Sequence, residues 1–414
     1  MTQQTSWAIR TIGEICSKPQ YGWTTKAAKS GKVHYLRTTD ISGKTVDWST
    51  VPFCVVEPDS IAKYTIQPDD ILVSRAGSVG VSYRVCSSPE NTVFASYLIR
   101  FRAKENEVLS SYLSWFLQSD DYWRAISEQS AGIAVPNVNA SKLADIKVPL
   151  APINEQRRIV AKLDQITARI DDAQTRLDTI PAILKRFRQS VLAAACSGRL
   201  TAGWRTQQSI CDTWSEKPLG QIGAVTGGIT KNGKRADFPM QVPYLRVANV
   251  YANRLDLTDI SFIGVTANEF ERTQLQTNDL LIVEGNGSID QIGRVAIWDG
   301  SVDGCTHQNH LIKFRAGNEI LPKYALSWLM SPQGRELLVA QATSSAGLHT
   351  LSISKVAGIR VAYPSKQEQT EIVRRVEALF KQADEIEARY KKSRAFVEKL
   401  TPAVLAKAFR GELV

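Results

Sequence analysis

Two long stretches of the chain place an apolar residue at alternating steps of four and three positions. In the first stretch the series is Ile159, Leu163, Ile166, Ile170, Ala173, Leu177, Ile180, Leu184, Phe187 and Val191. In the second it is Ile372, Val376, Leu379, Ala383, Ile386, Tyr390, Ser393, Val397, Leu400 and Val404. This spacing is typical of the contact face of a coiled-coil helix, so each stretch predicts one helix, about 60 Å long if about 40 residues are helical.

Proline and glycine mark the ends of both predicted helices. Each begins just after a proline, Pro152 or Pro364, and ends near a glycine, Gly198 or Gly411. Prolines also lie inside the apolar series, at positions 181 and 402. We expect them to kink or locally break the helices, because proline lacks the amide N–H that a helix interior uses.

The two helices belong to a duplicated module. Residues 153–201 match residues 366–414 without a gap, each position pairing with the one 213 further on. Each helix could pack only on its own globular region. We favour pairing between the helices, since two seams of equal length are natural partners, and in a pseudo-two-fold chain this pairing is antiparallel.

The duplication extends into the regions before the helices. The matching segments are HYLRTTDI (34–41) with PYLRVANV (243–250), IQPDDILV (66–73) with LQTNDLLI (275–282), and YLIRFRA (97–103) with HLIKFRA (310–316). Each half is therefore a globular portion of about 150 residues followed by one long helix, a size that folds unaided.

The globular portions have a mixed α and β pattern. Short apolar runs bounded by Gly, Pro and Asn predict strands at 71–74, 97–101, 280–283 and 311–314. Helices are expected at 111–126 and 322–339, in which Trp115 and Trp328 correspond and are expected in the core.

Composition indicates the cellular compartment of the protein and the charge of its binding partner. The chain has no run of 18 apolar residues, and its first residues, MTQQTSWAIR, lack an apolar signal core, so we expect a soluble cytoplasmic protein. Cysteines at 16, 54, 86, 196, 211 and 305 form no C-x-x-C pair, which favours reduced thiols. The net charge of +10 favours a polyanionic partner.

The sequence offers little for catalysis. It has no Asn-Pro-Pro-aromatic tetrapeptide of the amino-methyltransferase kind, and its Ser, His and Asp residues show no nucleophile spacing. Residues 228–234 have phosphate-loop spacing, but Arg235 follows where Ser or Thr would bind magnesium. Cys305, His307 and His310 lack a fourth metal ligand and lead into a predicted strand, so we expect no metal site.

The chain resembles the DNA specificity subunit of type I restriction-modification systems (HsdS) over nearly its whole length. The resemblance rests on INEQRRIVAKLD with IPAILKRFRQSVLAAACSGRLT, and on KQEQTEIVRRVEALFKQADEIE with LTPAVLAKAFRGELV. It implies an α+β protein in which two target recognition domains, 1–152 and 208–365, alternate with two conserved helical regions, 153–207 and 366–414. The two long helices would form an antiparallel coiled coil.

The resemblance also implies a function without catalysis. Each globular domain would read one half of a bipartite, asymmetric double-stranded DNA target, while the helices hold the halves apart and dock two methyltransferase subunits. Restriction subunits would join that core. We expect no cofactor on this chain, with S-adenosylmethionine, ATP and magnesium on the partner subunits.

Comparison of the two halves suggests which residues read DNA. A shared scaffold stays alike where it folds and differs where it reads, and base discrimination needs polar side chains at base edges. The loops that differ, with nearby basic and amide side chains, give these candidates: Lys26, Arg37, Arg75, Ser78, Ser96, Tyr97, Asn137, Asn139, Lys231, Lys234, Arg235, Arg246, Asn249, Asn286, Ser288, Gln291, His307, Gln308, His310 and His349. Arg37 and Arg246 are equivalent, so we expect them to hold the DNA backbone, whereas the other differences predict two different half-targets.

Two alternatives stay open at the level of sequence. One is a catalytic methyltransferase or nuclease, which the missing motifs disfavour. The other is a specificity-like subunit of a different defence complex or of a methylation-only complex, which the sequence does not separate from the first interpretation.

Overall fold

The computed structural model describes residues 7–43, 45–130, 137–210, 214–289, 291–345 and 348–414. The chain divides into two compact units. Unit 1 contains residues 1–178 and 391–414, and unit 2 contains residues 179–390. The class is α+β, as the sequence predicted, because each unit combines separate helices with mainly antiparallel sheets.

Unit 1 contains two four-stranded sheets, ordered β2-β11-β8-β9 and β10-β4-β7-β3, and the pairs β1-β12 and β5-β6. Its strands are β1 (Ala8–Thr11), β2 (Gln20–Tyr21), β3 (Ala27–Ala28), β4 (His34–Leu36), β5 (Ile41–Ser42), β6 (Thr45–Val46), β7 (Phe53–Cys54), β8 (Ile71–Ser74), β9 (Ser82–Arg84), β10 (Thr92–Phe94), β11 (Leu98–Phe101) and β12 (Lys147–Leu150). Its shorter helices are α1 (Ile12–Ile15), α2 (Ile61–Tyr64), α3 (Ser110–Phe116), α4 (Asp120–Ser130), α5 (Ala140–Ala144) and the 3₁₀ helix η1 (Thr38–Asp40).

Unit 2 repeats this plan with the sheets β14-β23-β19-β21, β18-β15-β22 and β20-β25-β24 and the pairs β13-β26 and β16-β17. Its strands are β13 (Ser215–Pro218), β14 (Gly223–Gly227), β15 (Met240–Leu245), β16 (Val250–Tyr251), β17 (Arg254–Leu255), β18 (Ser261–Val265), β19 (Leu280–Val283), β20 (Gly285–Asn286), β21 (Val295–Ile297), β22 (Thr306–His307), β23 (Leu311–Ala316), β24 (Thr343–Ser345), β25 (Leu348–Thr350) and β26 (Arg360–Tyr363). Its shorter helices are η2 (Arg199–Thr201), α7 (Ala202–Gln207), α8 (Leu219–Ile222), η3 (Gly233–Asp237), η4 (Val247–Asn249), α9 (Ala267–Thr273), α10 (Pro322–Met330), α11 (Pro332–Gln341) and α12 (Ile353–Ala357).

The two predicted long helices are α6 (Ile153–Cys196) and α13 (Lys366–Phe409), and each contributes one part to each unit. They end where predicted, with Gly198 and Gly411 at φ of 74° and 75°, a conformation that suits glycine. Both continue through Pro181 and Pro402, so the expected local break is wrong. Proline removes one helical hydrogen bond, and packing of the surrounding turns retains the helix.

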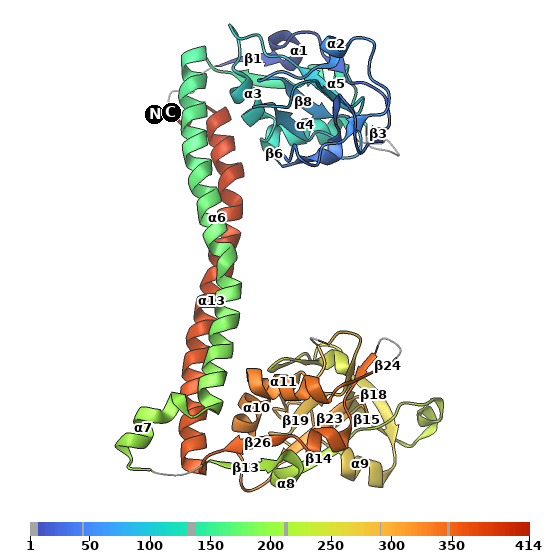
Figure 1. Ribbon diagram of the computed structural model, residues 1–414, viewed down its shortest axis with the longest axis vertical. Coiled ribbons are helices and arrows are strands. Elements are labelled where there is room, and N and C mark those ends of the chain that lie inside the picture. Colours follow the sequence, from blue (N-terminus) through green and yellow to red (C-terminus); the bar gives the residue numbers. More distant parts are fainter. Residues whose placement is uncertain (1–6, 44, 131–136, 211–213, 290, 346–347) are drawn as a thin grey trace. The chain divides into compact units, whose positions relative to one another are not determined.

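Within each unit, α6 and α13 lie side by side and run antiparallel (Figure 1). In unit 1, Leu405 and Phe409 near the end of α13 share a core with Ile159 near the start of α6. In unit 2 the core instead joins the end of α6 to Ile372 near the start of α13. Ion pairs also link α6 and α13 in each unit. In unit 1, Arg394 pairs with Asp178. In unit 2, Arg188 pairs with Asp384 at 2.7 Å and with Glu387 at 2.8 Å.

A buried glutamine fixes the first turn of each long helix to its globular domain. Gln156 Oε1 accepts from the Leu109 N–H at 2.9 Å, and its Nε2 donates to two carbonyls, of Glu107 and Ala151. Gln369 repeats all three bonds, with the Leu321 N–H at 2.7 Å and two carbonyls, of residues 319 and 364. The start of each long helix is therefore built into its domain.

The helices expected at 111–126 and 322–339 are each divided in two, as α3 with α4 and α10 with α11. In unit 2 the division lies at Ser331, whose hydroxyl accepts from the Gly334 N–H and caps α11, which begins at Pro332. In unit 1 the division lies at the buried Ser119. Both tryptophans, at 115 and 328, are buried as expected.

The predicted correspondence of Trp115 with Trp328 is wrong by one position. Tyr112 and Tyr324 are equivalent, because their hydroxyls donate to the carbonyls of residues 149 and 362 in β12 and β26. Counting along α3 and α10 from these tyrosines places Ser327 at the position of Trp115.

Two further features bear on the compartment. None of the described helices is both long and apolar enough to cross a membrane. Cysteines 16, 54, 86, 196 and 305 are free thiols, and position 211 lies outside the described residues.

Candidate nucleic-acid interface

Three segments that differ between the halves meet at one place in unit 1. The Arg75 N–H, just after β8, donates to the Tyr97 carbonyl at 2.8 Å. The Val138 N–H donates to the Arg75 carbonyl at 3.0 Å, and the Ala140 N–H donates to the Tyr21 hydroxyl at 2.9 Å. Backbone hydrogen bonds therefore bring the candidates of loops 74–78, 94–97 and 137–139 together. Position 136 of the last loop lies outside the described residues.

The side chains at this place in unit 1 are aromatic and basic. The Arg75 guanidinium lies over the Tyr21 ring, 5.0 Å from its centroid. The Tyr97 side chain is 60% exposed, Ser78 and Asn137 are exposed, and Ser96 is half-buried. Buried Nε of Arg75 has no hydrogen-bond partner among the described residues. This is a small platform with an arginine, a stacking ring and hydroxyl and amide groups.

Unit 2 repeats the backbone arrangement with other side chains. The Glu284 N–H, just after β19, donates to the His310 carbonyl at 2.9 Å, and the Leu351 N–H donates to the Glu284 carbonyl at 2.8 Å. Strand β20 pairs with β25, which sets Asn286 opposite His349. Positions 75 and 284 are therefore structurally equivalent, as are Tyr97 and His310.

The unit 2 side chains at this place carry the opposite charge. The Glu284 carboxylate lies 3.5 Å from His310 Nδ1, and the two side chains are 25% and 48% exposed. Burial raises the pKa of Glu284, although His310 opposes this shift. Ser288 and Gln291, which are close to Glu284 in sequence, are exposed. The backbone of Gln308 forms an isolated parallel β-bridge with Ile229.

Three candidates make hydrogen bonds that stabilise the fold. Asn139 caps α5, where its Oδ1 accepts from the Lys142 N–H at 2.9 Å. Asn249 is 4% exposed and holds the Arg246 N–H and two carbonyls, of residues 256 and 259. His307 is fully buried with Nδ1 3.0 Å from the Leu311 carbonyl, and burial lowers its pKa to about 4. Asn249 and His307 are therefore too buried to reach a base edge, whereas Asn139 caps its helix and is exposed.

The equivalent arginines 37 and 246 each have a carboxylate partner. Arg37 is bound to Asp40 at 2.6 Å, which raises the arginine pKa, and Arg246 to Asp259 at 2.7 Å. Both remain about one-third exposed, at 39% and 33%. They can therefore still approach a phosphate, which agrees with the expected backbone role without testing it.

The basic candidates outside these loops lie on the surface with one exception. Lys26, Lys231 and Lys234 are exposed. Arg235 is only 11% exposed and binds Glu269 at 2.7 Å, which lowers the pKa of that carboxyl to about 2. Arg235 therefore pairs with Glu269 within the domain and does not present a free charge to solvent.

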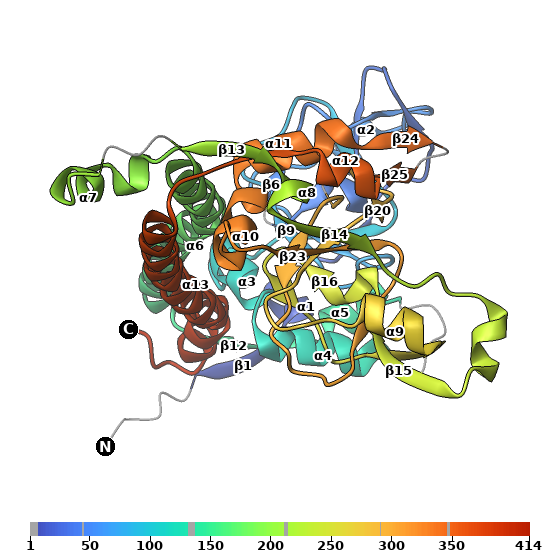
Figure 2. The same ribbon diagram turned by 90° about the horizontal axis from the view of Figure 1, so that it is seen from below.

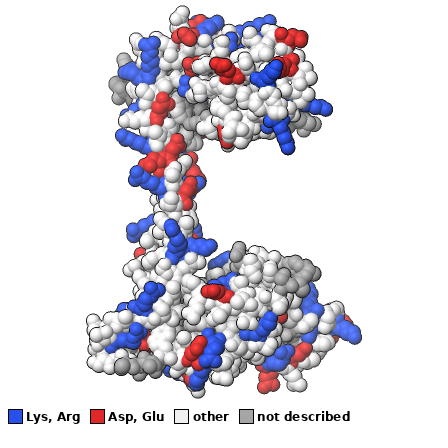
Figure 3. All heavy atoms as spheres, viewed as in Figure 1, with Lys and Arg blue, Asp and Glu red and all other residues white. Residues whose placement is uncertain are grey.

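Two residues at this candidate interface were not predicted from the sequence. Tyr21 was missed because it lies far from residues 75 and 97 in sequence, in β2 next to β11. Glu284 was missed because an acidic residue is not the usual mark of a DNA-binding surface, although the comparison with Arg75 singled out its loop. On the face drawn in Figure 3, basic and acidic side chains are interspersed on each unit, so charge alone does not mark a DNA-binding surface on that face.

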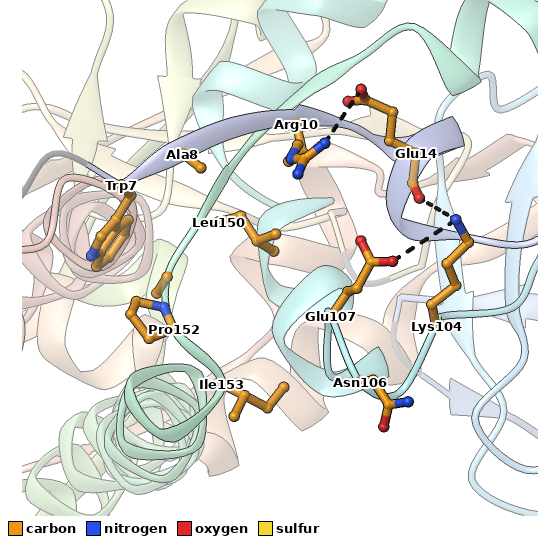
Figure 4. A pocket seen from close by; sticks show the side chains of 11 residues that line it. Trp7, Ala8, Arg10, Glu14, Lys104, Asn106, Glu107, Leu150, Pro152 and Ile153 are labelled. Atoms are coloured by element: carbon orange, nitrogen blue, oxygen red, sulfur yellow. Dashed lines mark hydrogen bonds and ion pairs between the residues drawn. The ribbon is translucent and has the colours of Figure 1, made fainter.

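A cavity of about 820 Å³ lies in unit 1 beside the start of α6 (Figure 4). The charged side chains that line it have partners. Arg10 pairs with Glu14 at 3.7 Å. Lys104 donates to the Glu14 carbonyl at 2.6 Å and lies 4.0 Å from the Glu107 carboxylate. Within the described ranges, no three His, Cys, Asp or Glu side chains gather as a metal site would require.

Sequence comparisons place the chain among known proteins. A family model described as the type I restriction modification DNA specificity domain matches residues 4–182 and 211–393. The chain is 32% identical over 391 residues to the type I restriction enzyme EcoKI specificity subunit of Escherichia coli K12, covering 91% of this chain and 82% of that protein. It is 31% identical over 388 residues to the StySPI specificity subunit of Salmonella potsdam, with the same coverage.

Solved structures share the fold. The HsdS subunit from Thermoanaerobacter tengcongensis has a TM-score of 0.64 at 18% identity, covering 99% of this chain and 98% of that one. A chain solved in work on complex assembly and conformational transition of the type I R-M system has a TM-score of 0.70 at 17% identity, covering 99% of both. The chain belongs to the family of type I restriction-modification DNA specificity subunits.

Proposed function

We propose that this chain is the sequence-specific DNA-binding subunit of a type I restriction-modification complex and reads a bipartite, asymmetric target. The observation that carries the proposal is the pair of equivalent backbone platforms, at Arg75 with Tyr97 and at Glu284 with His310, whose side chains differ. A frame that is repeated while its exposed side chains change suits two domains that read different half-targets.

The helices α6 and α13 hold the two half-targets at a fixed spacing as an antiparallel coiled coil. Their apolar seams and their packing within each unit support this role. One added heptad in both helices, near Arg169 and Gln382, keeps each seam position on its face and lengthens the pair by about 10 Å. The spacer between half-targets should then grow by roughly three base pairs.

The complex contains two methyltransferase subunits for each copy of this chain, and restriction subunits join it. The ungapped duplication of the helices supports this stoichiometry, because it offers two similar docking faces. The chain itself is non-catalytic. S-adenosylmethionine, ATP and magnesium act on the partner subunits, and the complex works in the cytoplasm, where genomic DNA is its substrate.

The experiment is methylome sequencing of a host that expresses the chain with its methyltransferase subunits. We expect one motif with two specified parts and an unspecified spacer, and no methyl transfer by the purified chain alone. DNA binding by the complex should weaken steeply as salt rises, since phosphate contacts release counterions. Methylation by the isolated chain, or a single continuous motif, would contradict the proposal.

A further inference from the structure

We propose that Arg75 and Glu284 are base-reading residues at equivalent positions, Arg75 for a guanine in one half-target and Glu284 for a cytosine in the other. This inference rests on the proposed function and goes further by naming the reading residue in each unit and the base that it selects.

The first step is the equivalence of the two positions. Residue 75 follows β8 directly and residue 284 follows β19, which are matching central strands of the two units. Each uses its N–H to bind the neighbouring loop, at Tyr97 or His310, and its carbonyl to bind a third segment. Both backbones are therefore fixed on both sides, as a site for precise recognition requires.

The second step is the change of charge. A phosphate attracts arginine but repels glutamate, so a position that holds Arg75 in one unit and Glu284 in the other is unsuited to a contact with the DNA backbone. The equivalent arginines 37 and 246 keep the same charge in both units, as a phosphate contact would require. Base edges present both donors and acceptors, and therefore suit either charge.

The third step is the match between side chain and base. The fork of Arg75 can donate two hydrogen bonds to O6 and N7 of guanine, and Arg75 is partly exposed. The Glu284 carboxylate only accepts, so it needs an amino donor, which cytosine N4 and adenine N6 provide. Adenine also presents the acceptor N7 next to its amino group, which repels a carboxylate, and this favours cytosine.

The neighbours support these assignments. The Tyr21 ring stacks with the Arg75 guanidinium at 5.0 Å and orients it. His310, 48% exposed, lies 3.5 Å from the Glu284 carboxylate and favours its ionised form. Each reading side chain thus has one partner that positions it and remains partly exposed.

The test compares Glu284→Gln and Arg75→Gln with the wild-type chain, each co-expressed with the methyltransferase subunits and measured by methylome sequencing and by binding to a randomised DNA library. Glu284→Gln should reduce the preference for cytosine about tenfold at one position of one half-target and leave the other half unchanged. Arg75→Gln should do the same for a guanine in the other half. Glu336→Gln, the same chemical change at an exposed position of α11, is the matched control and should leave the motif unchanged.

The outcomes distinguish a failure of the proposed function from a failure of the base assignments. A wild-type complex without a bipartite motif would refute the proposed function. A bipartite motif that neither variant alters, or affinity that falls equally for all sequences, would overturn this inference alone. If Glu284→Gln lowers the melting temperature of the chain below the assay temperature, Glu284→Asp keeps the charge and shortens its reach. It should weaken the same preference without changing the base, and an unchanged preference would count against the inference.

Discussion

The two units repeat the same backbone plan. Some equivalent positions hold the same residue in both units, and others hold residues of opposite charge. Gln156 and Gln369 are identical and each make the same three buried bonds. At the ends of the matching strands, Arg75 and Glu284 have equivalent backbones and opposite charges. In these two pairs, identity is retained where a buried amide has three partners to satisfy, and the difference occurs at a partly exposed loop position. If the proposed readers are correct, this duplicated protein keeps the folding contacts and varies the recognition contacts within one chain.

The units also differ inside the frame. Trp115 of unit 1 donates its indole N–H to Asp164 on α6 at 2.9 Å, whereas its counterpart in unit 2 is Ser327. A groove of about 330 Å³ lies there between α10 and α13, two helices that Figure 2 shows as neighbours, and Glu377 lines it at the position equivalent to Asp164. The second unit thus lacks an aromatic contact that the first one has.

The largest effect is expected from exchanging these two residues. Trp115→Ser should destabilise unit 1 by about 3–5 kcal/mol, because it removes a buried indole and leaves a cavity. Ser327→Trp should stabilise unit 2 by about 1 kcal/mol by filling the existing groove. Thermal unfolding of the two variants would test both signs. Ser327→Ala is the control and should be nearly neutral, and a strong loss from Ser327→Trp would show that the positions are not equivalent.

A smaller and equal effect is expected from the shared glutamines. Gln156→Leu and Gln369→Leu each leave one N–H and two carbonyls without their buried partner, which costs on the order of 2–3 kcal/mol. Hydrogen exchange should increase at the first turns of α6 in one variant and of α13 in the other. Gln165→Leu, at an exposed position of α6, is the control. Very unequal effects in the two units would contradict the shared role.

The smallest predicted effect is a difference in pH dependence. Arg100 and Lys313 occupy equivalent buried positions, beside Asp70 and Asp279, and burial lowers the pKa of Lys313 to about 8. The unfolded chain holds this proton up to about pH 10.4, so the lysine should make unit 2 more stable as pH rises from 8 to 10, by about 1–2 kcal/mol.

Lys313→Arg tests this difference by copying unit 1, since arginine stays charged throughout that range. Urea unfolding at pH 7.5 and at pH 10 should show a smaller gain, or a larger loss, for the variant than for the wild type. Equal pH dependence of the two proteins would mean that Lys313 does not titrate as proposed.

The features that the sequence predicted are those with a strong local pattern. The seam from Ile159 to Val191 fixes the position of α6, and the glycines beyond both long helices fix where they end. The shift between Trp115 and Trp328 shows the limit, because the register of these two aromatic strings is determined by the tyrosine hydroxyl bonds and by the glutamine bonds to Leu109 and Leu321. The site was less predictable, since Tyr21 joins Arg75 only through the pairing of β2 with β11.

Exchange of one whole recognition domain tests the central claim most directly, because that claim is that each unit reads its own half-target. Residues 208–365 would be replaced with the equivalent segment of a relative that has a different target, and the hybrid would be expressed with the same methyltransferase subunits. Methylome sequencing should then show one half of the motif replaced, and the other half and the spacer unchanged. A change in both halves, or in neither, would contradict the account.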